Sequence, residues 1–235
     1  MDFLRGVWSW FLDPSHWQGP DGVPTRLAEH LHLSIEAVLI GAVIALPLGI
    51  TLGHYGRFGN LAISTSNIGR AIPSYGILVI AFTVLGLGDG PIILALTALA
   101  IPPMVTNSYV ALSEVDPDIK EAARGMGYRE LPQLLRIELP LSVPLIMAGV
   151  RTSAIQVVAT ATVAALVAGG GLGRYIIDGF AQFDYTKLFA GALLVALLAL
   201  ATEASLTLVE TVLVPRGIRR QRVRAGRRAA AFKTA

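Results

Sequence analysis

Five long apolar stretches constrain this chain more than any other feature. A helix needs roughly 20 mostly apolar residues to cross the hydrocarbon of a bilayer, and the stretches of that kind are about 31–53, 61–86, 91–112, 142–168 and 188–213. Hydrophobic residues make up 54% of the 235 residues and charged residues only 15%, against about 25% charged in soluble domains. The sequence therefore predicts an all-α integral membrane protein, a helical bundle with five spans over 31–213.

Prolines interrupt several of these stretches, at Pro47, Pro73, Pro102 and Pro103. Proline removes a backbone hydrogen bond, and such breaks are tolerated in a membrane where neighbouring helices or a water-filled path satisfy the freed groups. The breaks indicate a bundle that encloses a pathway rather than a simple anchor.

The N-terminal segment, residues 1–30, contains all three tryptophans of the chain, Trp8, Trp10 and Trp17. It lacks the basic start and continuous apolar run of a cleavable signal. Tryptophan favours the membrane–water interface, so we expect residues 3–12 to form a short interfacial helix.

The C-terminal tail, 214–235, is strongly basic and has no acidic residue. Its basic residues are Arg216, Arg219, Arg220, Arg222, Arg224, Arg227, Arg228 and Lys233. The positive-inside rule places this tail in the cytoplasm, and five spans then place the N-terminus outside and the 113–141 loop inside. We expect the tail to contact anionic membrane lipid rather than nucleic acid, because nothing else in the chain supports nucleic-acid binding.

The inner loop 113–141 begins with a predicted short helix. Asp116 can cap it and Pro117 suits the first helical position. The residues that recur at helical spacing on one apolar face are Ile119, Ala122, Ala123 and Met126. Gly125 and Gly127 predict its end.

A second short helix is predicted after the glycines, with Leu131, Leu134 and Leu135 on one side and Pro140 as its end. The loop carries six acidic and four basic residues, a net charge of −2, which argues against lipid or nucleic-acid binding. The pattern alone leaves two readings open, a hairpin that only ties two spans together and a docking surface for another protein.

The same loop resembles the EAA motif of ABC importer permeases, EAA-x3-G-x9-I-x-LP, at every spacing. The matching residues are Glu121, Ala122, Ala123, Gly127, Ile137, Leu139 and Pro140. In that family the segment is a cytoplasmic coupling helix that docks on the ATP-binding subunit. The resemblance implies the fold of a type I ABC importer permease in a bacterial cytoplasmic membrane.

The resemblance extends over about 31–213. Within the family the sequence is similar to the osmoprotectant branch, whose members import glycine betaine, choline or carnitine. The segments that carry it are RAIPSYGILVI from Arg70, IPPMVTNSYVALSEVDPDIKEAARGMG from Ile101, LPLSVPLIMAGVRT from Leu139 and TATVAALVAGGGLG from Thr160. Permeases for D-methionine, and for small thiols or betaines such as ergothioneine, look similar and remain alternatives. The implied partners are an ATP-binding subunit dimer, an extracytoplasmic solute-binding protein and a second permease subunit, identical or paralogous.

Polar residues beside the broken helices are candidates for lining the substrate pathway. They are Arg70, Ser74, Tyr75, Asn107 and Tyr109; the asparagine and serine could equally bind carbonyls that the prolines leave free. Ionisable groups inside a bilayer are costly and usually face a bundle interior. We therefore expect an ion pair between Arg70 or Arg151 and Glu203.

Several function classes have no support in the sequence. There is no cysteine, the four histidines form no metal-binding pattern, and no P-loop sequence is present, so we expect ATP and magnesium to bind the partner ATPase. An intramembrane enzyme is the alternative from another class, but the predicted spans contain no aspartate and only one histidine, His32.

Overall fold

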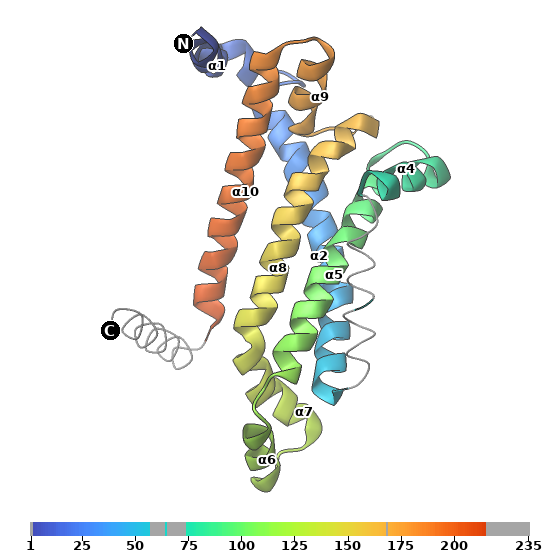
Figure 1. The fold of residues 1–235 in the computed structure, drawn as a ribbon, viewed down its shortest axis with the longest axis vertical. Coiled ribbons are helices and arrows are strands. Elements are labelled where there is room, and N and C mark those ends of the chain that lie inside the picture. Colours follow the sequence, from blue (N-terminus) through green and yellow to red (C-terminus); the bar gives the residue numbers. More distant parts are fainter. Residues whose placement is uncertain (1, 57–63, 65–73, 168, 215–235) are drawn as a thin grey trace, which may run out of the picture.

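The computed structural model describes residues 2–56, 64, 74–167 and 169–214. Throughout these residues the regular structure is helical. Four helical segments are long and apolar enough to cross a membrane: α2 (Val23–Tyr55), α5 (Asp89–Ser113), the run Glu130–Val167 that contains α8 (Leu139–Ala161), and α10 (Tyr185–Leu213). They lie side by side along the long axis (Figure 1). They overlap four of the five expected stretches, but α2 begins eight residues earlier than expected and the run Glu130–Val167 twelve residues earlier.

The expected span 61–86 lies mostly outside the described residues. Its described part is α4 (Ser74–Leu85), a short apolar helix. The described residues therefore contain four spans, and the fifth stays a prediction.

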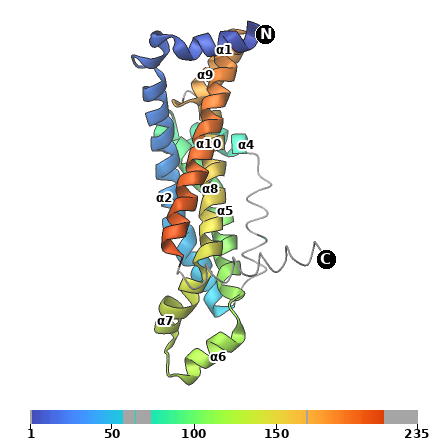
Figure 2. The same ribbon diagram turned by 90° about the vertical axis from the view of Figure 1, so that its left-hand side faces the viewer.

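The short helices gather at the two ends of the bundle. α6 (Pro117–Gly125) and α7 (Glu130–Gln133) lie at one end, called here the α6 end. The other, called the α9 end, carries α9 (Gly173–Ala181) and α1 (Asp2–Leu12). Figure 2 shows α1 lying across the long helices there, as expected of the tryptophan-rich segment. A 3-10 turn (Pro14–Trp17) connects α1 to α2.

Small residues bring α2 and α5 into close contact. They recur at every fourth position of α2 and are all buried: Ala37, Gly41, Ala45, Gly49 and Gly53. This is the spacing at which two membrane helices can approach closely. A Cβ at Gly53 would lie only 2.5 Å from the carbonyl oxygen of Tyr109, so the backbones themselves touch.

Buried hydrogen bonds join α5 to α8 and to α2. Ser153 Oγ on α8 donates to the Ala100 carbonyl on α5 at 2.8 Å, and Thr97 donates to the Ala37 carbonyl at 3.3 Å. The main core cluster draws its residues from α2, α4, α5 and α8. These helices therefore form one packed unit, against which α10 stands at the side of α8 (Figure 1).

A second cluster holds the α9 end together. Trp10 packs edge-on against Tyr175, with ring centres 5.4 Å apart, and the Tyr175 hydroxyl donates to the Asp21 carbonyl at 2.6 Å. Burial raises the pKa of Tyr175 to about 12. The Gly171 amide donates to Glu29 Oε2 at 2.7 Å. This bond fixes the glycine-rich segment 169–173 to the start of α2.

Candidate coupling site

The α6 helix begins as its sequence predicts. The Asp116 side chain accepts a hydrogen bond from the Asp118 amide at 2.9 Å and Pro117 occupies the first turn. The helix ends where Gly127 adopts a left-handed conformation, with φ of 84°. Glycine alone adopts such a φ readily, and the Tyr128 amide then closes the end on the Ala123 carbonyl at 3.1 Å.

The predicted apolar face of α6 is mostly open. Only Ala123 is buried against the rest of the chain, at 1% exposure, whereas Met126 is 69% exposed and Ile119 40%. Glu121 and Ala122 are exposed as well. Exposed apolar side chains that lie together, on an otherwise polar helix, are typical of a surface that another protein covers.

The second predicted helix is not ended by Pro140, and that prediction was wrong. α7 passes through a π-helical turn (Leu134–Glu138) directly into α8, and Pro140 lies in the first turn of α8. A proline clashes with the carbonyl four residues before it in a regular helix. The wider turn, in which the Leu139 amide bonds to the Leu134 carbonyl, removes that conflict because its hydrogen bonds span five residues.

The π turn directs Glu138 into the protein, where it is fully buried. Its Oε1 accepts a hydrogen bond from Gln133 Nε2 at 2.7 Å. Its Oε2 lies 2.8 Å from His54 Nδ1 at the end of α2 and 3.5 Å from Lys120 Nζ on α6. Three separate elements thus meet at one carboxylate.

Two of these partners are themselves held from a second side. Lys120 Nζ also donates to the Leu112 carbonyl at the end of α5, at 3.0 Å. His54 Nε2 lies 3.1 Å from Glu130 Oε2 on α7. These groups, His54, Lys120, Glu130, Gln133 and Glu138, are called here the Glu138 cluster.

Reasoning from the sequence missed the Glu138 cluster, although one signal pointed to it. Glu138 is an acidic residue between Ile137 and Leu139, two apolar residues at the start of an apolar helix. An acidic side chain there needs a partner, because burying an unpaired charge is costly. The partner on α2 lies 84 residues away in the sequence, and only the fold reveals it.

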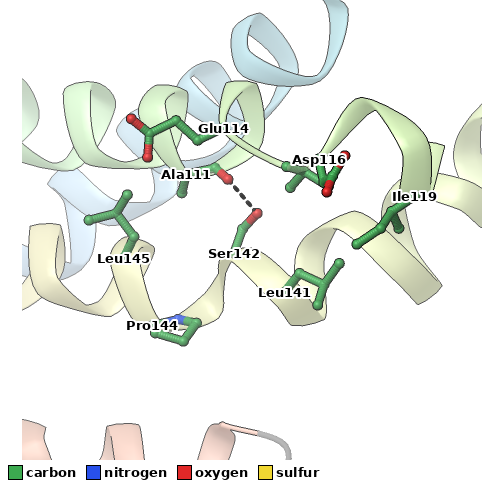
Figure 3. Close-up of a pocket in the computed structure, with 9 residues that line it drawn as sticks. Ala111, Glu114, Asp116, Ile119, Leu141, Ser142, Pro144 and Leu145 are labelled. Atoms are coloured by element: carbon green, nitrogen blue, oxygen red, sulfur yellow. Dashed lines mark hydrogen bonds between the residues drawn. The ribbon is translucent and has the colours of Figure 1, made fainter. Parts of the chain in front are cut away.

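A cleft opens beside α6, between the end of α5 and the start of α8. Its volume is about 270 Å³, and Figure 3 shows the Ser142 hydroxyl in it, hydrogen-bonded to the Ala111 carbonyl at 2.8 Å. The cleft is lined by apolar side chains of α6 and α8 and by acidic residues of the α5–α6 connection: Ile119, Leu141, Leu145, Glu114 and Asp116. The surface around α6 therefore contains a cleft lined by both apolar and acidic side chains.

The candidate pathway residues do not form one group. Ser74, on α4, lines a small void of about 10 Å³ against α5 and the turn after α8, and Tyr75 is half exposed. Asn107, further along α5, donates from Nδ2 to the Pro103 carbonyl at 2.8 Å, and Tyr109 packs against the main core. Arg70 lies outside the described residues.

Glu203 was expected to pair with Arg70 or Arg151; the Arg151 alternative was wrong, and the Arg70 alternative lies outside the described residues. Arg151 Nη2 lies 3.2 Å from Glu210 Oε2, and its Nη1 donates to Thr207 Oγ1 at 2.9 Å. α8 continues past the end of α10 toward α7 (Figure 1). The last turn of α10 therefore lies beside the middle of α8, where Arg151 meets Glu210.

Comparisons with known proteins agree with this architecture. Residues 45–216 match the family model described as binding-protein-dependent transport system inner membrane component. The glycine betaine/carnitine/choline transport system permease protein of Bacillus subtilis is 34% identical, over 82% of this chain and 89% of that protein. The carnitine transport permease protein of Listeria monocytogenes is 36% identical, over 83% and 89%.

Among solved structures, an inward-facing form of the MetNI methionine ABC transporter superposes with a TM-score of 0.72. The match covers 86% of this chain and 99% of that one, at 22% identity. At that identity the likeness speaks for the fold alone.

Proposed function

Because the chain belongs to the family of binding-protein-dependent transport system inner membrane components, we propose that it is the permease subunit of an ATP-driven importer of osmoprotectants. The relatives that support this substrate class carry glycine betaine, carnitine or choline in their names. All three substrates are quaternary ammonium compounds. The methionine alternative rests on likeness of fold.

The open apolar face of α6 is the observation that carries the proposal of coupling. The face lies at the tip of the bundle, next to a cleft, on the helix that carries Glu121, Ala122 and Ala123, the first residues of the EAA motif. We place this end in the cytoplasm and the α9 end outside, following the basic tail. A separate ATPase then binds α6, and a solute-binding protein delivers substrate at the opposite end.

Transport follows from moving α6. The ATPase subunits close on ATP and carry the α6 helices of two permease subunits with them, and the substrate path between these subunits opens in turn to each side. The chain's own residues contribute the docking surface and the packed helices that move; hydrolysis belongs to the partner.

Charge reversal at Glu121 tests the docking role. Glu121→Lys should abolish uptake of radiolabelled glycine betaine and copurification of the ATPase, while the amount of protein in the membrane stays normal. Asp89→Lys is the control for ATPase binding, because Asp89 is also exposed but lies at the opposite end of α5, away from α6 and its cleft; it should leave copurification of the ATPase unchanged. Normal uptake by the Glu121→Lys variant would contradict the proposal.

Competition tests the substrate class in the same cells. Excess unlabelled choline or carnitine should reduce glycine betaine uptake, and excess D-methionine should not. The reverse pattern would transfer the proposal to the methionine branch.

A further inference from the structure

The Glu138 cluster occupies the junction between the proposed docking helix and the long helices. The Glu138 carboxylate is fully buried, whereas most of the α6 surface is exposed. A buried carboxylate is stable only when its oxygens are paired. Here the partners come from α2, α6 and α7, so the pairing also fixes three elements to the start of α8.

We propose that Glu138 is the positioning residue through which a displacement of α6 reaches α2, with Lys120 and His54 as the two links. The inference rests on the proposed function, because it takes α6 as the helix that the ATPase moves. Lys120 connects Glu138 to α6, and His54 connects it to the end of α2. α2 follows because it is packed backbone to backbone on α5, so the three helices move together.

Few other contacts could carry the motion from α6. Of the side chains on α6, Ala123 is buried and Lys120 is partly buried, while the others are exposed. The Ala123 methyl group supplies packing but no directional bond. Lys120, in contrast, reaches both Glu138 and the Leu112 carbonyl at the end of α5.

The charge of His54 completes the cluster. Each of its ring nitrogens faces a carboxylate oxygen, of Glu138 at 2.8 Å and of Glu130 at 3.1 Å. Only the protonated imidazole can donate from both nitrogens. With His54 and Lys120 positive and the two carboxylates negative, the charges balance.

Other groups around His54 do not change this balance. The ring of Tyr55 lies edge-on at 5.0 Å, and Gln133 is neutral and bonds the far oxygen of Glu138. A neutral side chain in place of His54 would remove the positive charge between the two carboxylates and leave the cluster with excess negative charge.

The test measures substrate transported per ATP hydrolysed, in proteoliposomes that hold the whole transporter and its binding protein. Glu138→Gln keeps the shape of the side chain but removes its charge. We expect at least about a tenfold lower ratio, the effect of losing one charge-assisted hydrogen bond, with ATP hydrolysis retained. Asp89→Asn, which also converts an exposed carboxylate to an amide but lies at the opposite end of α5, should leave the ratio unchanged.

His54→Gln supplies a second variant in case Glu138→Gln does not fold. It should lower the ratio, because glutamine carries no charge to balance the carboxylates of Glu130 and Glu138. Adding His54→Gln to Glu138→Gln should cause little further loss, because both changes break the same link. A wild-type ratio in both single variants would overturn the inference.

Distances give a direct readout of the link. The chain has no cysteine, so Arg124→Cys on α6 and Leu48→Cys on α2 can be spin-labelled without further changes. In wild type the distribution of distances between the labels should be the same with and without bound ATP. In Glu138→Gln this distribution should become broader. A wild-type distance that changes with ATP would also overturn the inference.

The two proposals fail in different ways. Loss of transport in Glu121→Lys together with a normal ratio in Glu138→Gln and His54→Gln would contradict only the role of Glu138. Normal transport in Glu121→Lys would contradict the docking role itself.

Discussion

Gly49 lies at the close contact between α2 and α5, and adding one methyl group there should destabilise the protein measurably. A Cβ at this position would be 2.7 Å from both Ser108 Cβ and the Val105 carbonyl oxygen, whereas carbon atoms prefer separations of about 3.5–4.0 Å. The two helices would have to move apart by most of an ångström. Overpacking of this kind costs about 1–3 kcal/mol.

Thermal unfolding of the purified protein in detergent measures the effect. For a chain of this size each kcal/mol corresponds to about 2–4 °C in Tm, so Gly49→Ala should lower Tm by roughly 2–12 °C. Gly125→Ala is the matched control, because nothing lies within 4 Å of its Cβ position; it should leave Tm unchanged or raise it slightly. An unchanged Tm for Gly49→Ala would refute the direct backbone contact between α2 and α5.

Three further predictions concern other parts of the chain. Met126→Glu should leave Tm unchanged, since the side chain is 69% exposed, but weaken ATPase copurification about tenfold or more, because a large apolar side chain gains about 1.5–3 kcal/mol when covered. In double-mutant cycles on Tm, Arg151→Gln should couple with Glu210→Gln by about 0.5–3 kcal/mol and not with Glu203→Gln; coupling to Glu203 instead would contradict the observed pair. Tyr175→Phe should lower stability by about 1 kcal/mol through loss of a hydrogen bond to a backbone carbonyl. Burial raises the pKa of Tyr175 from 10.0 to about 12, so the greater stability of wild type over the variant should be complete below pH 10 and be lost as pH rises toward 12. A wild type that is still more stable than the variant at pH 12 would rule out the phenol as the source.

The sequence predicted the long helices well because membrane thickness limits them more strictly than packing does. It also predicted α1, and the start and end of α6, from tryptophan, the Asp116 cap and Gly127. It placed the start of α2 too late, since Val23–His30 is polar and continues the helix beyond its apolar stretch. Arg26 and Glu29 there pair with each other at 2.9 Å, which makes a polar first turn stable.

The partners of charged groups could not be predicted in the same way. Arg151 and Glu210 meet only because of the relative shift of two antiparallel helices, and counting residues from the expected span ends missed that shift. Glu138 and His54 meet through the packing of α2 beside α8. Apolar patterning is a property of each segment, whereas a specific ion pair depends on how segments are placed against each other.

The π turn at Leu134–Glu138 sets how α7 is rotated about the helix axis relative to α8. A π turn accommodates one extra residue, and each residue of a helix advances by about 100° around the axis. α7 is therefore rotated by about that angle relative to a regular helix continued from α8. The direction in which Glu130 and Gln133 project toward the Glu138 cluster is fixed by a count of residues as much as by contacts, and deleting a single residue from the turn would point both side chains away from it.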